Sequence, residues 1–267
     1  NINVKDGRWA WNLSGNLNVA NNRTRTLLAR DSYDVEGTNY FRQSGNTESD
    51  RNNYGGRLGV EHQLSNRSTL SVSGNVRGRA YKNNDELAYT ERDAAQLWLR
   101  GGDQLNASEN AGNEAGAQVS FKHRTPKEGR EWSTDLTWNH SSRRSDQTFG
   151  TRATDEAGNA LVGGVRTQRN DGSTESDQFT WQFDMTDPRN ERTKLEYGLR
   201  SNVRDERSVL EVLVGTDTSA TVYDPTLSND YRITDMVNAA YLNVTRKLND
   251  RWGVQAGLRV EQTAFEA

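Results

Sequence analysis

The sequence has no cysteine, only three prolines and no long hydrophobic run. Without cysteine there is no disulfide framework and no metal site built on thiolates. Hydrophobic residues make up only 32% of the chain, which raises disorder as an alternative, but seven Trp and nine Tyr argue against it. No apolar stretch approaches the about 20 residues of a membrane helix. A membrane barrel stays open as an interpretation, because alternating strands average to a low hydropathy.

Signals of catalysis and of nucleic-acid binding are also scarce. The formal net charge is −3, which disfavours a nucleic-acid partner. The histidines, His62, His123 and His140, fall in separate predicted strands, and the sequence contains no His-Glu-x-x-His metal motif. No nucleophile stands beside a base in the sequence. We therefore expect neither an enzyme nor a bound metal or cofactor.

What the sequence does contain is alternation with a period of two. Odd positions from Trp9 to Val19 carry Trp, Trp, Leu, Gly, Leu and Val, and the even positions between them carry Ala, Asn and Ser. The stretch from Trp252 to Glu261 alternates in the same way, with Arg259 and Glu261 on the second face. Successive side chains of a strand point to opposite faces. An apolar face opposite a charged face predicts a transmembrane barrel, with lipid outside and water inside.

Short turns recur at intervals of about sixty residues. Turn signals rich in Asn, Asp, Gly and Pro are centred near Asp6, Asn66, Glu128, Arg189 and Asn249. Long polar stretches lie between them, at about 21–53, 82–114 and 142–175, and a fourth contains Pro225. We predict an all-β antiparallel meander of hairpins, with short periplasmic turns and long extracellular loops, an asymmetry typical of outer-membrane barrels.

Three tryptophans share one level in this scheme. Trp9, Trp132 and Trp252 each stand at the start of the strand that follows a short turn. An indole ring is apolar, but its N–H needs a partner, so tryptophan is favoured at the interface between membrane and water. We predict that these three are membrane-interface residues. The alternative is three core tryptophans that happen to begin strands.

The positions between the apolar residues carry charges of both signs. On the lipid face each charge would cost about 2–4 kcal/mol at the membrane midplane, so we predict that they face a hydrated lumen. The solvated face of a soluble sheet would explain the charges equally well, but it would not explain the unequal connections. The predicted lumen-facing residues are Arg57, Glu61, Arg77, Glu196, Arg200, Arg259 and Glu261.

Two hairpins carry a family resemblance. Residues 179–184 with 194–200, and residues 238–241 with 255–261, resemble hairpins of TonB-dependent outer-membrane receptors, in particular the receptor-like barrels common in Bacteroidetes. The resemblance covers about residues 175–265 and implies a barrel of about twenty-two strands around an N-terminal plug. The chain shows about nine strands and a partial tenth. We therefore expect residues 1–267 to form a partial barrel domain that stays open, with plug and TonB box elsewhere in a longer protein.

The resemblance also implies a function, namely TonB-dependent uptake of a nutrient ligand across the outer membrane. The implied partners are outer-membrane lipid, TonB acting through a plug outside this chain, and a surface lipoprotein or other envelope protein. Two alternatives stay open: a barrel scaffold in a larger envelope complex that transports nothing, and a soluble secreted β-rich adhesin. The expected ligand contacts are aromatic residues of the predicted outer loops, namely Tyr33, Tyr40, Phe41, Tyr89, Trp98 and Tyr223.

Overall fold

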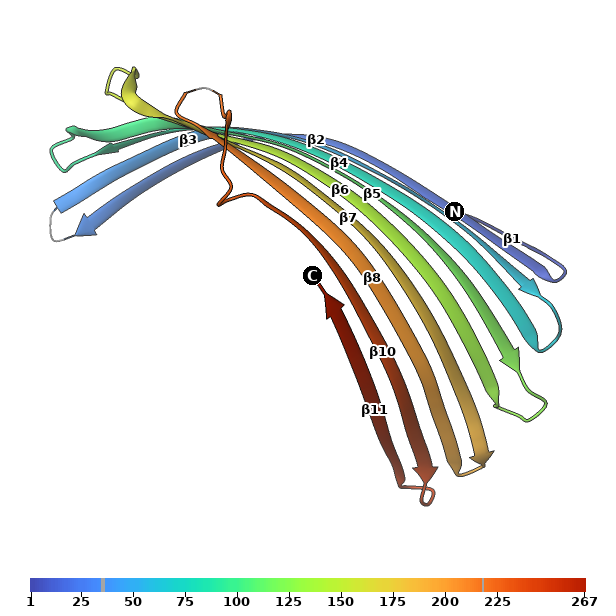
Figure 1. Cartoon of the computed structure of the whole chain (residues 1–267). Helices are drawn as coiled ribbons and strands as arrows, with labels where there is room; N and C mark the ends of the chain where they lie inside the picture. Colours follow the sequence, from blue (N-terminus) through green and yellow to red (C-terminus); the bar gives the residue numbers. More distant parts are fainter. Residues whose placement is uncertain (35–36, 218) are drawn as a thin grey trace.

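The computed structural model is one curved antiparallel sheet (Figure 1). It describes residues 1–34, 37–217 and 219–267. Ten strands lie side by side in chain order, and the two-residue strand β9 pairs with β8. The strands are β1 (Ile2–Asp6), β2 (Trp9–Asp34), β3 (Gly37–Gln63), β4 (Ser68–Arg92), β5 (Trp98–Arg124), β6 (Glu131–Thr154), β7 (Ala160–Asn190), β8 (Thr193–Gly215), β9 (Val222–Tyr223), β10 (Asn229–Lys247) and β11 (Gly253–Glu266).

The strand order confirms the all-β antiparallel meander predicted from the alternation. The number of strands is slightly higher than expected, since β9 brings it to eleven. Within the described residues β1 and β11 are the two edges of the sheet and do not pair with each other, so the expected open wall is confirmed as well. The same residues contain no helix that is long and apolar enough to cross a membrane.

The five short turns lie close to where the sequence predicts them. The last turn shows how one is closed: the backbone N–H of Trp252 and of Arg251 both donate to the side-chain oxygen of Asn249, each at 2.9 Å. The turn between β5 and β6 needs Gly129, whose φ of 70° is in the left-handed region. The fourth turn was predicted too early, because β7 continues to Asn190 and the chain reverses at 191–192.

The prediction of long extracellular loops is wrong, because the polar stretches are strands. Strands β2 to β8 contain 23 to 31 residues each, and short segments join them at 93–97 and 155–159. The connection from β8 to β10 holds β9. Backbone hydrogen bonds between strands require no alternation of side chains, so a ladder can continue where both faces are polar. We call these polar parts, beyond the alternating segments, the strand extensions.

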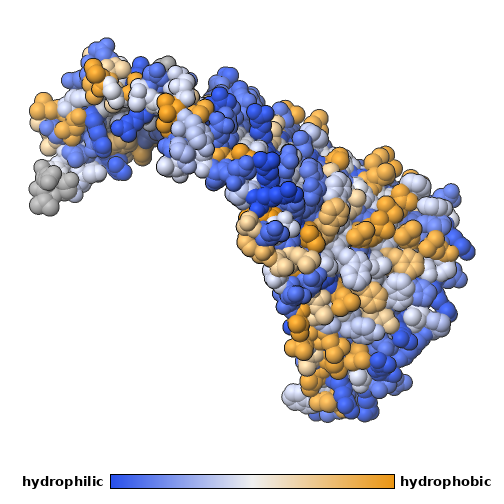
Figure 2. Space-filling view, in the orientation of Figure 1, coloured by the Kyte–Doolittle hydropathy of each residue, from blue (hydrophilic) through white to orange (hydrophobic). Residues whose placement is uncertain are grey.

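The apolar side chains do not gather in a protein core. Among the described residues the buried hydrophobic side chains are Met185, Val212 and Ala239 alone. Leu13, Val72 and Leu258, which a soluble protein would bury, are 50%, 45% and 70% exposed. Large apolar side chains gather over the half of the sheet that ends in the short turns (Figure 2). Apolar surface of this extent is stable only against an apolar surrounding.

Candidate functional site

The register of the strands joins the alternating segments into two continuous faces. Antiparallel partners point to the same side of a sheet, so a row of partners shows the character of one face. One row on the apolar face runs through Trp11, Val60, Val72, Val119, Leu136 and Trp181. The adjacent row, on the polar face, runs through Ala10, Glu61, Ser71, Ser120, Asp135 and Gln182. The sheet is therefore amphipathic from β2 to β7 at this height.

The apolar face is apolar only over a limited height, which we call the belt. On β4 it runs from Leu70 to Ala80, and on the paired strand β5 from Phe121 down to Ala111. Transmembrane β-strands need about 9–11 residues, which matches this height. The next position on the same face is charged: Lys82 of β4 forms an ion pair with Glu109 of β5. The belt thus has the height of a hydrocarbon layer and ends abruptly in charge.

The three predicted interface tryptophans lie at the short-turn end of the belt. Trp9 is the first residue of β2, and Trp252 closes the turn before β11. Trp9 stacks on His62 with 3.9 Å between ring centroids, and Trp132, near the start of β6, packs against Phe121 at 5.1 Å. All three therefore lie beside a short turn, as the sequence predicts. Their contact with a membrane interface stays a prediction.

The polar face holds all seven residues predicted to face the lumen. On β8 and β11 their charges pair within the sheet: Lys194 lies 2.8 Å from Glu196, and Arg259 pairs with Glu261. Arg200 of β8 forms no ion pair among the described residues, so this part of the polar face keeps one positive charge. That the face looks into water stays a prediction.

Strands β3 to β6 carry a different arrangement on the polar face, an arginine patch of Arg51, Arg77, Arg79 and Arg143. Arg79 and Arg143 flank Gly112, with Nε and Cγ respectively 3.4 and 3.5 Å from the point where a Cβ would stand. Arg143 is 3.8 Å from Glu114. Within the described chain the other three arginines form no ion pair, although Arg51 lies over the Tyr81 ring at 5.1 Å. The patch therefore keeps excess positive charge.

Two hollows border the arginine patch. The larger, about 620 Å³, is lined by Arg79, Tyr81 and Arg143 among others, and the smaller, about 480 Å³, by Arg77, Arg79 and Glu114. Sequence reasoning identified only Arg77 as lumen-facing, because Arg51 and Arg143 fell in stretches interpreted as loops. Arg79 could have been found, because it follows Arg77 by two residues and so shares its face if the strand continues.

The strand extensions are held together by cross-strand ion pairs. Arg232 of β10 donates to Asp205 of β8 at 2.9 Å, and Arg207 of β8 donates to Asp230 of β10 at 3.0 Å. These hydrogen bonds lower the pKa of Asp205 and of Asp230 below the ordinary carboxyl value. All four side chains lie on the same face as the belt but beyond it. The extensions are thus built for water rather than for lipid.

The six aromatic ligand candidates lie on strands, not on loops as predicted. The structure brings two of them together: the rings of Phe41 on β3 and Tyr89 on β4 are stacked, with centroids 6.0 Å apart on the polar face. Arg30 lies over Phe41 at 5.2 Å. The other four are spread over the far ends of the strands: Tyr33 (β2), Tyr40 (β3), Trp98 (β5) and Tyr223 (β9). The loop placement is wrong because the strand extensions carry these residues.

Solved structures similar to this chain share little sequence with it. The ferric preacinetobactin receptor BauA from Acinetobacter baumannii is 8% identical, with a TM-score of 0.26 over 99% of this chain and 60% of that one. The copper transporter OprC has a TM-score of 0.18 at 8% identity, covering 98% and 62%, and the FrpB iron transporter from Neisseria meningitidis has 0.17 at 8%, covering 98% and 62%. The chain thus spans about 60% of the length of these proteins, and likenesses this weak carry no argument.

Family membership comes from the sequence. No curated protein matches the chain. The outer membrane protein beta-barrel family, however, matches residues 123–267, which is just over half of the chain and covers β6 to β11 completely. With the all-β meander, this match places the protein in the outer membrane and excludes the soluble secreted alternative. The chain belongs to the outer membrane protein beta-barrel family.

Proposed function

We propose that the chain forms part of the barrel wall of an outer-membrane receptor. This receptor takes up a nutrient ligand with energy supplied through TonB. The observation that carries this proposal is an amphipathic sheet of ten strands side by side whose edges, β1 and β11, stay apart. A barrel wide enough to include such a wall leaves a lumen that side chains alone do not fill, and barrels of about twenty-two strands are plugged. The resemblance of two hairpins to those of TonB-dependent receptors supports the same function. The role is transport rather than catalysis.

Each surface of the wall has a part in this function. The belt contacts lipid, and the polar face with the arginine patch faces the plug and the path that opens beside it. The strand extensions project on the extracellular side, and the stacked pair of Phe41 and Tyr89 is the first contact for the ligand, because both rings lie on the polar face. A surface lipoprotein or other envelope protein would cover the ends of the extensions.

Uptake by living cells tests the proposal. Accumulation of radiolabelled nutrients, such as metal chelates and oligosaccharides, is compared between cells with the gene and cells without it. We expect at least one compound whose accumulation needs the gene and is abolished by a protonophore, because TonB draws on the proton gradient. A compound that enters through the protein at the same rate with the protonophore would contradict energy coupling. If no compound is lost with the gene, the scaffold alternative is favoured.

A double variant then tests the aromatic contact. Phe41→Ala with Tyr89→Ala is expected to weaken ligand binding about tenfold, equivalent to about 1.4 kcal/mol, because it removes the stacked rings. The matched control is Leu105→Ala, which also truncates an exposed side chain of a strand extension but lies on the opposite face. The dissociation constant of the purified full-length protein gives the answer. Equal effects of the two changes would contradict the assignment.

A further inference from the structure

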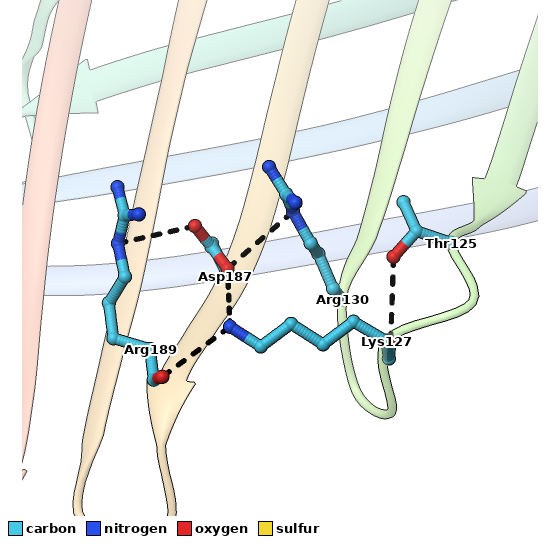
Figure 3. A network of polar contacts seen from close by, with 5 residues as sticks. All are labelled: Thr125, Lys127, Arg130, Asp187 and Arg189. Atoms are coloured by element: carbon cyan, nitrogen blue, oxygen red, sulfur yellow. Dashed lines mark hydrogen bonds and ion pairs between the residues drawn. The ribbon is translucent and has the colours of Figure 1, made fainter.

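The buried carboxylate of Asp187 holds three cations at the short-turn end of the sheet (Figure 3). Asp187 is only 1% exposed. Its oxygens lie 3.4 Å from Lys127 Nζ, 3.5 Å from Arg130 Nε and 3.3 Å from Arg189 Nε. We call these four residues the cation cluster. Its three positive charges face one negative charge, so it carries an excess of two.

Local backbone geometry fixes the cluster. The turn at 125–130 is closed by hydrogen bonds from Thr125 N to Arg130 O, 2.8 Å, and from Arg130 N to Lys127 O, 3.1 Å. Gly129 brings the turn so close to Pro188 that an added Cβ would lie 3.3 Å from the proline ring. Lys127 also donates to the backbone oxygen of Arg189 at 3.5 Å. The turn of one hairpin is thereby fastened to the next hairpin, and its cations are held in place.

The position of Asp187 relative to the belt sets the depth of the cluster. Asp187 follows Phe183 and Met185 on the apolar face of β7, two residues per step. At about 3.3–3.4 Å per residue it lies one short step below the last apolar side chain. Trp132, a predicted interface residue, is the direct partner of Met185 on β6. The cluster is therefore at the depth of lipid headgroups, on the side that faces the lipid.

The surplus charge extends along four of the five short turns, whereas the fourth, 187–192, has equal numbers of basic and acidic residues. The turns and their flanking residues, 5–8, 64–67, 124–131, 187–192 and 246–251, hold eleven Lys and Arg against six Asp and Glu, a net charge of +5. The whole chain has a formal net charge of −3, so the remainder carries −8. Glu128 and Glu191, acids of the two turns at the cluster, form no ion pair with its cations in the described chain. Positive charge is therefore concentrated where the sheet meets the periplasmic leaflet.

Arg130 adds an unsatisfied donor to this picture. Its Nε is buried and has no hydrogen-bond partner among the described residues, because its contact with Asp187 is an ion pair at 3.5 Å without hydrogen-bond alignment. The buried Nε faces the protein, but the Arg130 side chain is 40% exposed, so its outer N–H groups can donate to a phosphate oxygen. Phosphate groups of glycerophospholipids are the anions present at this depth of the periplasmic leaflet.

We propose that the cation cluster of Lys127, Arg130 and Arg189, oriented by Asp187, binds the headgroup phosphate of an anionic glycerophospholipid in the periplasmic leaflet. Binding fixes the depth of the barrel in the membrane, because the cluster lies at the level of the headgroups. It also fixes the orientation, because the positive charge lies at the short-turn end and the negative charge at the opposite end of the sheet. The occupant is a lipid rather than free phosphate, since the apolar side chains of Phe183 and Met185 continue directly above the cluster and match an acyl chain.

Lipid binding to the purified full-length protein in detergent tests the proposal. Native mass spectrometry would count dioleoylphosphatidylglycerol bound at increasing lipid, with dioleoylphosphatidylcholine as the zwitterionic comparison. We expect retention of the anionic lipid over the zwitterionic one. The double variant Lys127→Gln with Arg189→Gln should weaken this retention about fivefold for each charge removed. The matched control, Arg23→Gln with Arg25→Gln, removes two cations of a strand extension and should leave retention unchanged.

Other results of the lipid-binding experiment would contradict the proposal. Equal retention of both lipids, or equal losses in the variant and in its control, would overturn the proposal. Displacement of the lipid by millimolar inorganic phosphate would show a general anion site and overturn the lipid assignment. The heat-dependent shift in gel mobility of folded barrels shows whether each variant is folded. If the double variant does not fold, Lys127→Gln alone, which leaves two cations on Asp187, is expected to show the fivefold loss, and full retention would contradict the proposal.

Discussion

At the scale of single residues, the same arrangement of ring and glycine recurs on both faces of the sheet. On the polar face Tyr241 of β10 lies across Gly198 of β8 and donates to Asp184 of β7. On the apolar face Tyr54 of β3 lies across Gly78 of β4, and its hydroxyl reaches Asn113 of β5 at 3.1 Å. A glycine within a strand leaves room for a neighbouring aromatic ring, so one tyrosine ties three strands together.

Gly198 gives a prediction at this scale. A Cβ at Gly198 would lie 2.5 Å from the Phe183 backbone oxygen and 2.5 Å from Cε1 of Tyr241. Gly198→Ala should therefore displace the ring, break its hydrogen bond to Asp184, and lower the free energy of unfolding by about 1–3 kcal/mol. In the control Gly150→Ala the nearest atoms are 3.9 Å away, so the change should be within about 0.5 kcal/mol. Urea unfolding of the full-length protein in lipid measures both. Equal stability of the two variants would show that the Tyr241 arrangement contributes little.

At the scale of the strand, the sequence predicts those segments whose two faces meet different environments, lipid on one side and water on the other. From Trp9 to Val19 one face is apolar and the other polar, so the period of two is visible in the letters. Beyond the belt both faces meet water and the alternation disappears. Residues 142–154 of β6 therefore look like a loop, although each is paired with β5 or β7. The contact between Phe41 and Tyr89 depends on that register and could not be foreseen, and neither could the cation cluster, which joins two hairpins.

The pairing of strand extensions leads to a prediction on pH. Hydrogen bonds from Arg232 and Arg207 lower the pKa of Asp205 and Asp230. A carboxyl whose pKa is lower in the folded state stabilises the fold above its unfolded value of about 4, and this stability is lost as the pH falls through the folded value. We expect the β8–β10 extension to open below about pH 4, while the belt stays closed.

Hydrogen exchange measures this opening in peptides 205–211 and 229–235. Peptide 195–203, in the belt, is the reference, and the rates are corrected for the pH dependence of the intrinsic exchange rate. The variant Arg207→Gln with Arg232→Gln removes the cause of both pKa shifts. Its extension should exchange faster at pH 7 and show no further step near pH 4. A pH step of the same size in this variant would mean that other groups hold the extension.

At the scale of the whole molecule, the arrangement of the sheet in the membrane depends on which of its faces contacts lipid. Val72 and Ser73 are neighbours on β4 at the same height and point to opposite faces. The Val72 side chain lies in the belt, whereas the Ser73 side chain points to the polar face, where Ser73, Glu61 and Arg57 are among the residues that line a hollow of about 180 Å³. Val72→Arg should destabilise the folded protein by about 2–4 kcal/mol, because the guanidinium enters hydrocarbon. Ser73→Arg should change stability by less than about 1 kcal/mol, because the side chain finds water and a carboxylate.

Folding of the full-length protein into phospholipid vesicles across a urea series gives both free energies, with the folded fraction measured from gel mobility without heating. The two variants add the same charge at the same height, so net charge cancels in the comparison. Valine is the larger residue and the better strand former, but strand propensity spans only about 1 kcal/mol, so a larger difference reports the environment of the face. If Ser73→Arg cost as much as Val72→Arg, the polar face would not be hydrated, and the roles proposed for the arginine patch and for the Phe41–Tyr89 pair would fail together. A larger cost at Val72 would place lipid against the belt along every strand that shares its register.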